Sequence, residues 1–339
     1  MTLACVFGCA ATTLSPEEAA FFREARPWGF ILFRRNVESP GQVRALTVAL
    51  RAAADRLDAP VMIDQEGGRV QRLGPPHWRR YPSAKAYRAM AMDDCRRRDL
   101  VCQAGRLMAN DLIALGINID CAPVLDVPVA GAHDVIGDRA FAETPAEVAS
   151  LARAMAEGLM AGGVLPVIKH IPGHGRARVD SHLQLPVVEA GRADLEAWDF
   201  APFRAMADMP IAMTAHVVYR ALDPDSPCTT SSHVIAEIIR GAIGFNGLLL
   251  SDDLSMKALD GALTDRTRSA LTAGCDIVLH CNGDLTEMRA VAAGAAPLTP
   301  LAQARADAAL SRLADPLEPW DRIEAAVRFE AMLTGSSRG

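Results

Sequence analysis

Three of the chain's eight histidines fall within one stretch of twenty residues, VIKHIPGHGRARVDSHLQLP, at positions 167–186. An apolar run leads into Lys169 and His170, and the proline and glycines that follow exclude a regular helix and favour a mobile loop. Asp180 and His182 come next, two residues apart, so on an extended backbone their side chains lie on the same side. Such a carboxylate can orient the imidazole, which can then act as general acid and general base near neutral pH.

Two carboxylates elsewhere stand out because of their neighbours. Asp64 begins the segment DQEGGRVQRL, where two glycines let a ligand approach the backbone closely and Arg72 supplies a guanidinium. A carboxylate beside a guanidinium can hydrogen-bond several hydroxyls of a polar substrate. Asp252 begins SDDLSM, so one of two adjacent carboxylates can enter a pocket while the other, Asp253, caps the element that follows.

The elements that must position these side chains are apolar, β-rich runs bounded by glycine, proline or aspartate. Eight such runs span residues 3–8, 29–33, 59–64, 116–124, 164–170, 210–217, 247–252 and 275–280. Alanine-rich segments with helical spacing lie between them, at 95–116, 145–163 and 231–244. Continuous apolar strands that alternate with helices indicate a parallel sheet covered on both faces, and eight such units predict a closed (β/α)8 barrel of the TIM type.

In barrel enzymes the chemistry lies at the carboxyl ends of the strands. The polar residues at or next to the predicted strand ends are Asp64, Asp126, Lys169, His170, His216, Asp252, Asp253 and His280. Any of them could instead cap a loop or a helix, and for Asp126 and His280 the sequence does not decide between the two roles. Segments 65–84 and 125–144 are too long for simple connections, so we expect them to be active-site loops.

Length and composition fit one large α/β domain. The 339 residues are 50% hydrophobic and 22% charged, which is enough apolar material for a large core. We expect a single catalytic domain over residues 1–339, with the barrel at about 3–300 and helices at about 301–334 packed against it. An open doubly wound sheet is the alternative, but it would need a glycine-rich phosphate turn such as GxGxxG, and the sequence contains none.

Charge and hydropathy argue against several classes of partner. A net charge of −6 gives no reason to expect nucleic acid or an anionic membrane as a partner, and no apolar run is long enough to span a bilayer. The first twenty residues lack a basic segment and turn acidic by Glu17, which argues against a signal peptide and predicts a cytoplasmic location. Eight scattered cysteines without CxxC spacing are expected to be free thiols in a reducing compartment.

Several blocks of this sequence resemble one enzyme family. Four blocks are similar to blocks of the β-N-acetylglucosaminidases of glycoside hydrolase family 3: KHIPGHG with the later DSH, SDDLSM, DQEGGRVQR and IGDRAF. GFILFRRN, APVLDV and MTAHVVY fit as well, and the resemblance runs in order from the first predicted strand to about residue 280. It is strongest to the cytoplasmic branch that recycles peptidoglycan.

The resemblance implies a mechanism and a site. The family retains the anomeric configuration through a covalent glycosyl-enzyme intermediate. By similarity, Asp252 is the nucleophile and His182 the acid/base, supported by Asp180. The sugar-binding residues map to Asp64, Arg72, Arg139, Lys169 and His170.

The implied substrate is a small carbohydrate. It is N-acetylglucosamine β-linked to anhydro-N-acetylmuramic acid, with or without a stem peptide. We expect no metal and no cofactor, and we expect the protein to be a monomer.

The residues alone leave other functions open. A metal-dependent barrel hydrolase could use His170, His174, His182 and Asp180 as ligands, although the intervening IPG excludes the helical geometry of an HExxH site. A Schiff-base aldolase could use Lys169, but it would leave the aspartate–histidine pair unexplained.

A protein that binds amino sugars without turning them over is the non-enzymatic alternative. It would need Asp64, Arg72 and Lys169, but it would not need Asp252 together with an aspartate-supported histidine.

Overall fold

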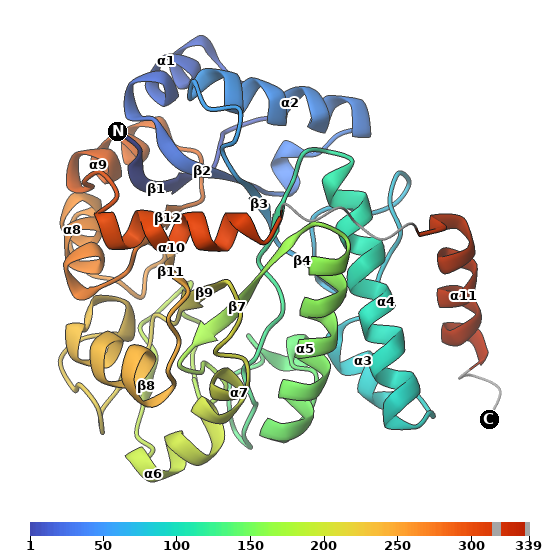
Figure 1. Ribbon diagram of the computed structural model, residues 1–339. Coiled ribbons are helices and arrows are strands. Elements are labelled where there is room, and N and C mark those ends of the chain that lie inside the picture. The colour runs from blue at the N-terminus through green and yellow to red at the C-terminus, as the bar shows by residue number, and fades with distance from the viewer. Residues whose placement is uncertain (314–319, 336–339) are drawn as a thin grey trace.

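Eight parallel strands close into a barrel, as the sequence predicted (Figure 1). The structure is a computed structural model, and it describes residues 1–313 and 320–335. Around the barrel the strand order is β1-β12-β11-β9-β7-β6-β3-β2. The strands are β1 (Leu3–Phe7), β2 (Pro27–Leu32), β3 (Val61–Ile63), β6 (Ile119–Asp120), β7 (Leu165–Ile171), β9 (Ile211–Thr214), β11 (Leu248–Asp253) and β12 (Ile277–His280). Each lies within or overlaps one of the eight predicted runs.

Alternate residues of each strand face the inside of the barrel, as the two-residue period of a strand requires. On β12, Ile277 and Leu279 pack in the barrel interior, whereas Val278 faces the surrounding helices. Val6, Met62, Leu165 and Leu248 belong to the same interior cluster, and all are fully buried. The interior is therefore filled with side chains, as in other barrels of eight strands.

A ring of helices covers the outside of the barrel (Figure 1). Its main members are α1 (Pro16–Ala25), α2 (Pro40–Ala53), α4 (Asp94–Ile113), α5 (Pro145–Ala161), α7 (Phe200–Ala205), α8 (Leu263–Ala273) and α9 (Leu285–Gly294). Several begin with a capping residue followed by proline; at α1, for example, Ser15 and Glu18 form a reciprocal capping box. None of the helices in the described residues is long and apolar enough to cross a membrane.

Some elements differ from the sequence-based prediction. The predicted helix at 231–244 forms, but over Val234–Ala242 it is wound as a π-helix, η5. The predicted loop 65–84 contains a short hairpin, β4 (Gln65–Gly67) and β5 (Val70–Gln71), and it leads into the helix α3 (Ala84–Ala89). The other long loop contains one helical turn, η2 (Gly137–Arg139). A second small sheet pairs β8 (Val187–Val188) with β10 (Val218–Tyr219).

The two C-terminal helices pack at different places. Helix α10 (Pro300–Ser311) lies across the amino ends of the strands, where Ala306 and Ala309 join the interior cluster (Figure 1). Helix α11 (Arg322–Gly335) packs on α4, and Arg322 Nη2 lies 2.6 Å from Asp111 Oδ1.

Candidate active site

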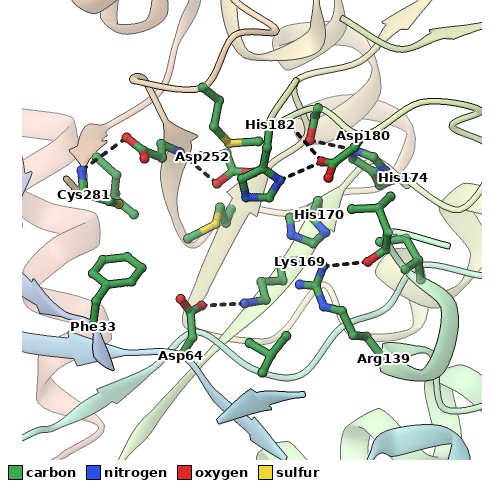
Figure 2. Close-up of a pocket in the computed structure, with 18 of the residues that line it drawn as sticks. Phe33, Asp64, Arg139, Lys169, His170, His174, Asp180, His182, Asp252 and Cys281 are labelled. Atoms are coloured by element: carbon green, nitrogen blue, oxygen red, sulfur yellow. Dashed lines mark hydrogen bonds and ion pairs between the residues drawn. The ribbon is translucent and has the colours of Figure 1, made fainter. Parts of the chain in front are cut away.

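A pocket opens at the carboxyl ends of the strands and encloses about 280 Å3 (Figure 2). Every predicted site residue lines it: Asp64, Arg72, Arg139, Lys169, His170, Asp180, His182 and Asp252. They come from β7, β11 and the loops after β3, β6 and β7. The volume falls just below the range of about 300–1,000 Å3 that is typical for drug-sized ligands, so the pocket suits one small polar molecule.

Ionic pairs define the floor of the pocket. Asp64, directly after β3, accepts hydrogen bonds from Arg72 Nη2 at 3.0 Å and Lys169 Nζ at 2.9 Å. Glu66 accepts two bonds from Arg139, at 2.9 and 2.8 Å, and its Oε1 lies 2.7 Å from Lys169 Nζ. Lys169 therefore joins two carboxylates, and three cations and two carboxylates form one fixed network.

The network keeps its members ionised. Burial acts to raise the pKa of Asp64, but the charges of Lys169 and Arg72 outweigh it and hold this pKa well below its usual range. The same opposition, with Arg139 as the main partner, lowers the pKa of Glu66 to about 2. Burial acts to lower the pKa of Lys169, but Asp64 and Glu66 raise it overall. A charged lysine cannot act as the nucleophilic amine of a Schiff-base aldolase, so the network argues against that alternative.

Asp126 lies behind His170 and orients it. Its Oδ2 is 2.7 Å from Nδ1 of His170, and its Oδ1 accepts the backbone amides of His170 at 3.2 Å and His174 at 2.7 Å. Asp126 is fully buried, yet its pKa lies below the usual value because the nearby histidines and amides outweigh the effect of burial. The sequence left the role of Asp126 undecided, and the structure shows it holding a pocket residue without lining the pocket.

The two carboxylates at the end of β11 have separate roles. Asp253 accepts bonds from the amides of Ser255 and Cys281 and from the hydroxyl of Ser255, so it caps the turn that follows the strand. Asp252 Oδ1 accepts the amide of Asp253 at 2.8 Å, and no donor in the described part of the chain bonds Oδ2. Burial acts to raise the pKa of Asp252, but His216, His170 and the Asp253 amide lower it overall. Asp252 is therefore an ionised carboxylate with one oxygen directed to the pocket.

Asp180 and His182 meet as predicted, but on a different backbone. Asp180 Oδ1 lies 2.8 Å from Nδ1 of His182 and also accepts the amide of His182 at 2.9 Å. Leu183 and Gln184 donate their amides to the Asp180 carbonyl, so the pair sits on a tight turn and not on the expected extended segment. Burial acts to raise the pKa of Asp180, but its bonds with His182 lower it overall. Figure 2 shows the His182 ring beside Asp252 at the top of the pocket.

The remaining strand-end histidines are structural. His216 bridges the hydroxyl of Thr229, at 2.7 Å, and the carbonyl of Asp253, at 3.0 Å, and burial lowers its pKa. His280 Nε2 lies 3.0 Å from Glu287 Oε2. Neither residue lines the pocket.

Sequence reasoning missed Glu66, although a signal was present. Glu66 follows Asp64 by two residues in DQEGG, the same spacing that singled out Asp180 and His182.

Within residues 1–313 and 320–335, no group of three or more histidine, cysteine and acidic side chains is arranged to hold a metal ion.

Comparison with known proteins gives a single family. A family model described as the glycosyl hydrolase family 3 N-terminal domain matches residues 13–315. A β-hexosaminidase of Alkalilimnicola ehrlichii is 44% identical over 282 residues, which cover 82% of this chain and 80% of that protein. A β-hexosaminidase of Pseudomonas aeruginosa is 39% identical over 285 residues, covering 83% of each.

Solved structures agree. NagZ from Neisseria gonorrhoeae, crystallised in complex with N-trifluoroacetyl-D-glucosamine, matches with a TM-score of 0.84 at 34% identity, covering 98% of this chain and 97% of that one. The family resemblance seen in the motifs is thereby confirmed, and the chain belongs to glycoside hydrolase family 3, among its β-hexosaminidases.

Proposed function

We propose that this protein is a retaining exo-β-N-acetylglucosaminidase in which Asp252 is the nucleophile and His182 the acid/base. The observation that carries the proposal is the pairing of an ionised carboxylate, with one oxygen directed to the pocket, and an aspartate-bound imidazole beside it (Figure 2). Asp64, Arg72, Arg139, Lys169 and His170 would bind the sugar in the pocket below them.

The proposed reaction has two steps. Asp252 attacks the anomeric carbon and forms an ester bond with the sugar, while His182 gives its proton to the departing glycosidic oxygen. His182 then takes a proton from water, which attacks the same carbon and releases Asp252 with the original configuration restored. Most retaining glycosidases use a second carboxyl as the acid/base. A histidine in that position removes one negative charge from beside the leaving oxygen.

Labelling with a slow substrate tests the nucleophile. A 5-fluoro analogue of N-acetylglucosaminyl fluoride should accumulate as an ester on a peptide containing SDDLSM, with the mass increase at Asp252. The Asp252→Ala variant should stay unlabelled and lose several orders of magnitude in turnover, while circular dichroism shows an intact fold. Labelling at Asp253 or Asp64 would overturn the assignment, and turnover itself separates an enzyme from a sugar-binding protein.

We further propose that the substrate is a cell-wall fragment, N-acetylglucosamine β-1,4-linked to anhydro-N-acetylmuramic acid, with or without a stem peptide. The complex of the Neisseria relative with an N-acylated glucosamine supports an amino sugar in the pocket. The pocket volume of about 280 Å3 favours one terminal sugar at a time. Purified enzyme should release N-acetylglucosamine from such disaccharides with or without peptide. Equal cleavage of internal bonds in long chitin chains would contradict this.

We propose one catalytic domain, a monomeric state and a cytoplasmic location. Nucleophile, acid/base and sugar-binding groups all lie in a single barrel, so no second domain needs to supply a catalytic residue. All eight cysteines are free thiols, which suits a reducing compartment. Light scattering of the purified protein and fractionation of cells that produce it would test the last two points.

A further inference from the structure

The loop between β7 and β8 consists of two parts with different anchoring. Its first part, residues 172–177, which we call the root, is fixed to the barrel by several bonds. Tyr219 Oη donates to the carbonyl of Gly173 at 2.6 Å, Arg176 Nε donates to the buried Asp199 at 2.6 Å, and Asp126 accepts the amide of His174 at 2.7 Å. The root is therefore part of the rigid scaffold.

The second part, residues 178–185, which we call the tip, carries Asp180 and His182 and is bound mostly to itself. Among the described residues, its hydrogen bonds to the rest of the protein run through Ser181 alone. The Ser181 hydroxyl lies 3.2 Å from Nε2 of His174, and the Ser181 carbonyl accepts the amide of Ala258 at 3.2 Å. Ser181 is buried, whereas the side chain of His182 next to it is 64% exposed.

His174 in the root is placed to hold this serine. Its side chain is buried, and its ring packs edge-on against His170 with 5.6 Å between centroids. Nδ1 has no hydrogen-bond partner within the described chain, so the bond to Ser181 is the single one its side chain makes there. Releasing the tip would leave both ring nitrogens of a buried imidazole without a protein partner, which opposes release.

We propose that His174 is a positioning residue that docks the tip through Ser181, so that His182 faces Asp252 during proton transfer. The inference rests on the proposed role of His182 as acid/base. The Asp180–His182 pair lies wholly within the tip, so it can leave and return with the tip unchanged. A single hydrogen bond shifts such a docking equilibrium by about three- to tenfold, which is enough to favour the docked tip and weak enough to allow release.

Substitution of Ser181 tests the effect on catalysis. Ser181→Ala should lower kcat/KM about tenfold for phenyl β-N-acetylglucosaminide, whose leaving group needs a proton. The 2,4-dinitrophenyl glycoside, which departs without one, should change by less than about twofold. Ser181→Thr keeps the hydroxyl and should restore the phenyl rate. The shape of the pH–rate profile should be the same in Ser181→Ala as in the wild type. An equal loss on both substrates would overturn the proposal.

A double-mutant cycle tests whether the bond itself is responsible. His174→Leu and Ser181→Ala should each lower the phenyl rate, and the double variant should be no slower than the slower single one. Additive losses would show that the two side chains act independently and would overturn the proposal.

Proteolysis tests the docking without reference to catalysis. Arg178 is exposed within the tip, so trypsin cleavage after it reports how often the tip is released. Cleavage there should be several-fold faster in Ser181→Ala and His174→Leu than in the wild type and Ser181→Thr, while the first cut elsewhere in the chain is unchanged. Equal rates at Arg178 in all variants would overturn the docking role, whatever residue proves to be the acid/base.

Discussion

At the scale of residues, ion pairs between the charged side chains of the pocket floor fix the positions of those side chains. Lys169 is held between Asp64 and Glu66, and Arg139 is held by Glu66. The two carboxylates offset most of the positive charge of Arg72, Arg139 and Lys169. The cations are therefore oriented donors for hydroxyl and acetamide groups and do not form an attractive patch for anions.

Glu66→Gln tests this organisation. The substitution removes a charge that fixes Lys169 and Arg139, and misplaced donors bind the transition state poorly. We expect kcat/KM to fall by about ten- to a hundredfold, with KM raised as well as kcat lowered. Glu143→Gln, at an exposed position in the sequence segment that contains Arg139, is the matched control. Unchanged kinetics in Glu66→Gln would show that the network is not needed.

His182→Ala tests the acid/base assignment. Loss of the proton donor should cost about a hundredfold or more in kcat/KM for the phenyl glycoside and far less for the 2,4-dinitrophenyl glycoside. His77→Ala, at an exposed histidine outside the pocket, should behave as the wild type. A uniform loss across both leaving groups would point to a role in binding.

Residue types and spacing singled out many of the residues that line this pocket, but not the partners that orient them. Asp252, Asp180 and His182 were found because they lie at a strand end or in a dense polar block. Ser181 was not found, because a serine among many polar residues has no feature in the sequence that distinguishes it. The docking role that we propose for Ser181 depends on a contact with His174 that only the folded loop creates.

At the scale of elements, the loop after β7 combines a fixed root with a tip that holds titratable groups. The role of Arg176 could not be predicted from the sequence, since its partner Asp199 lies 23 residues later in the chain. Burial raises the pKa of Asp199 to about 6 despite this arginine. The mobility predicted for the loop therefore remains a prediction for residues 178–185, whereas the glycines near Pro172 belong to the anchored part.

The pH dependence of stability tests the burial of His174. Burial and the neighbouring His170 lower the pKa of His174 from 6.5 to about 4. Between these values the unfolded chain binds a proton that the folded protein does not, so the free energy of unfolding falls as the pH falls. From pH 7 to pH 5 the wild type should lose about 2 kcal/mol more than His174→Leu, as measured by urea denaturation.

The comparison cancels the titration of His216 and Asp199, because both residues are present in both proteins. A difference between wild type and variant that stays constant from pH 7 to pH 5 would show that His174 is accessible to protons in the folded state.

At the scale of the whole molecule, the barrel could be predicted because its strands are buried on both faces and read as continuous apolar runs. The first and last residues of the strands could not be predicted. The run 116–124 contains only two residues of regular strand, Ile119–Asp120. The helix at 231–244 was predicted, but its π winding was not, since apolar spacing does not distinguish nine residues of wider helix from an α-helix.

Chelation tests the metal-dependent alternative for the whole enzyme. Asp64, Asp126 and Asp180 already bind cations, amides or histidines of the same chain. Dialysis against a strong chelator should leave kcat and KM unchanged. Loss of activity that added zinc restores would revive the metal-dependent mechanism.

Helix α10 closes the amino end of a barrel whose interior is already solid. The described residues therefore close the pocket on the amino side of the barrel. In the proposed mechanism the aglycone departs before water reaches the bound sugar, and the sugar leaves last, through the opening by which it entered. Free N-acetylglucosamine should consequently compete with incoming substrate for the same empty enzyme, and a long polymer cannot be threaded through. Each binding event is therefore expected to release one sugar, as the proposed exo-cleavage requires.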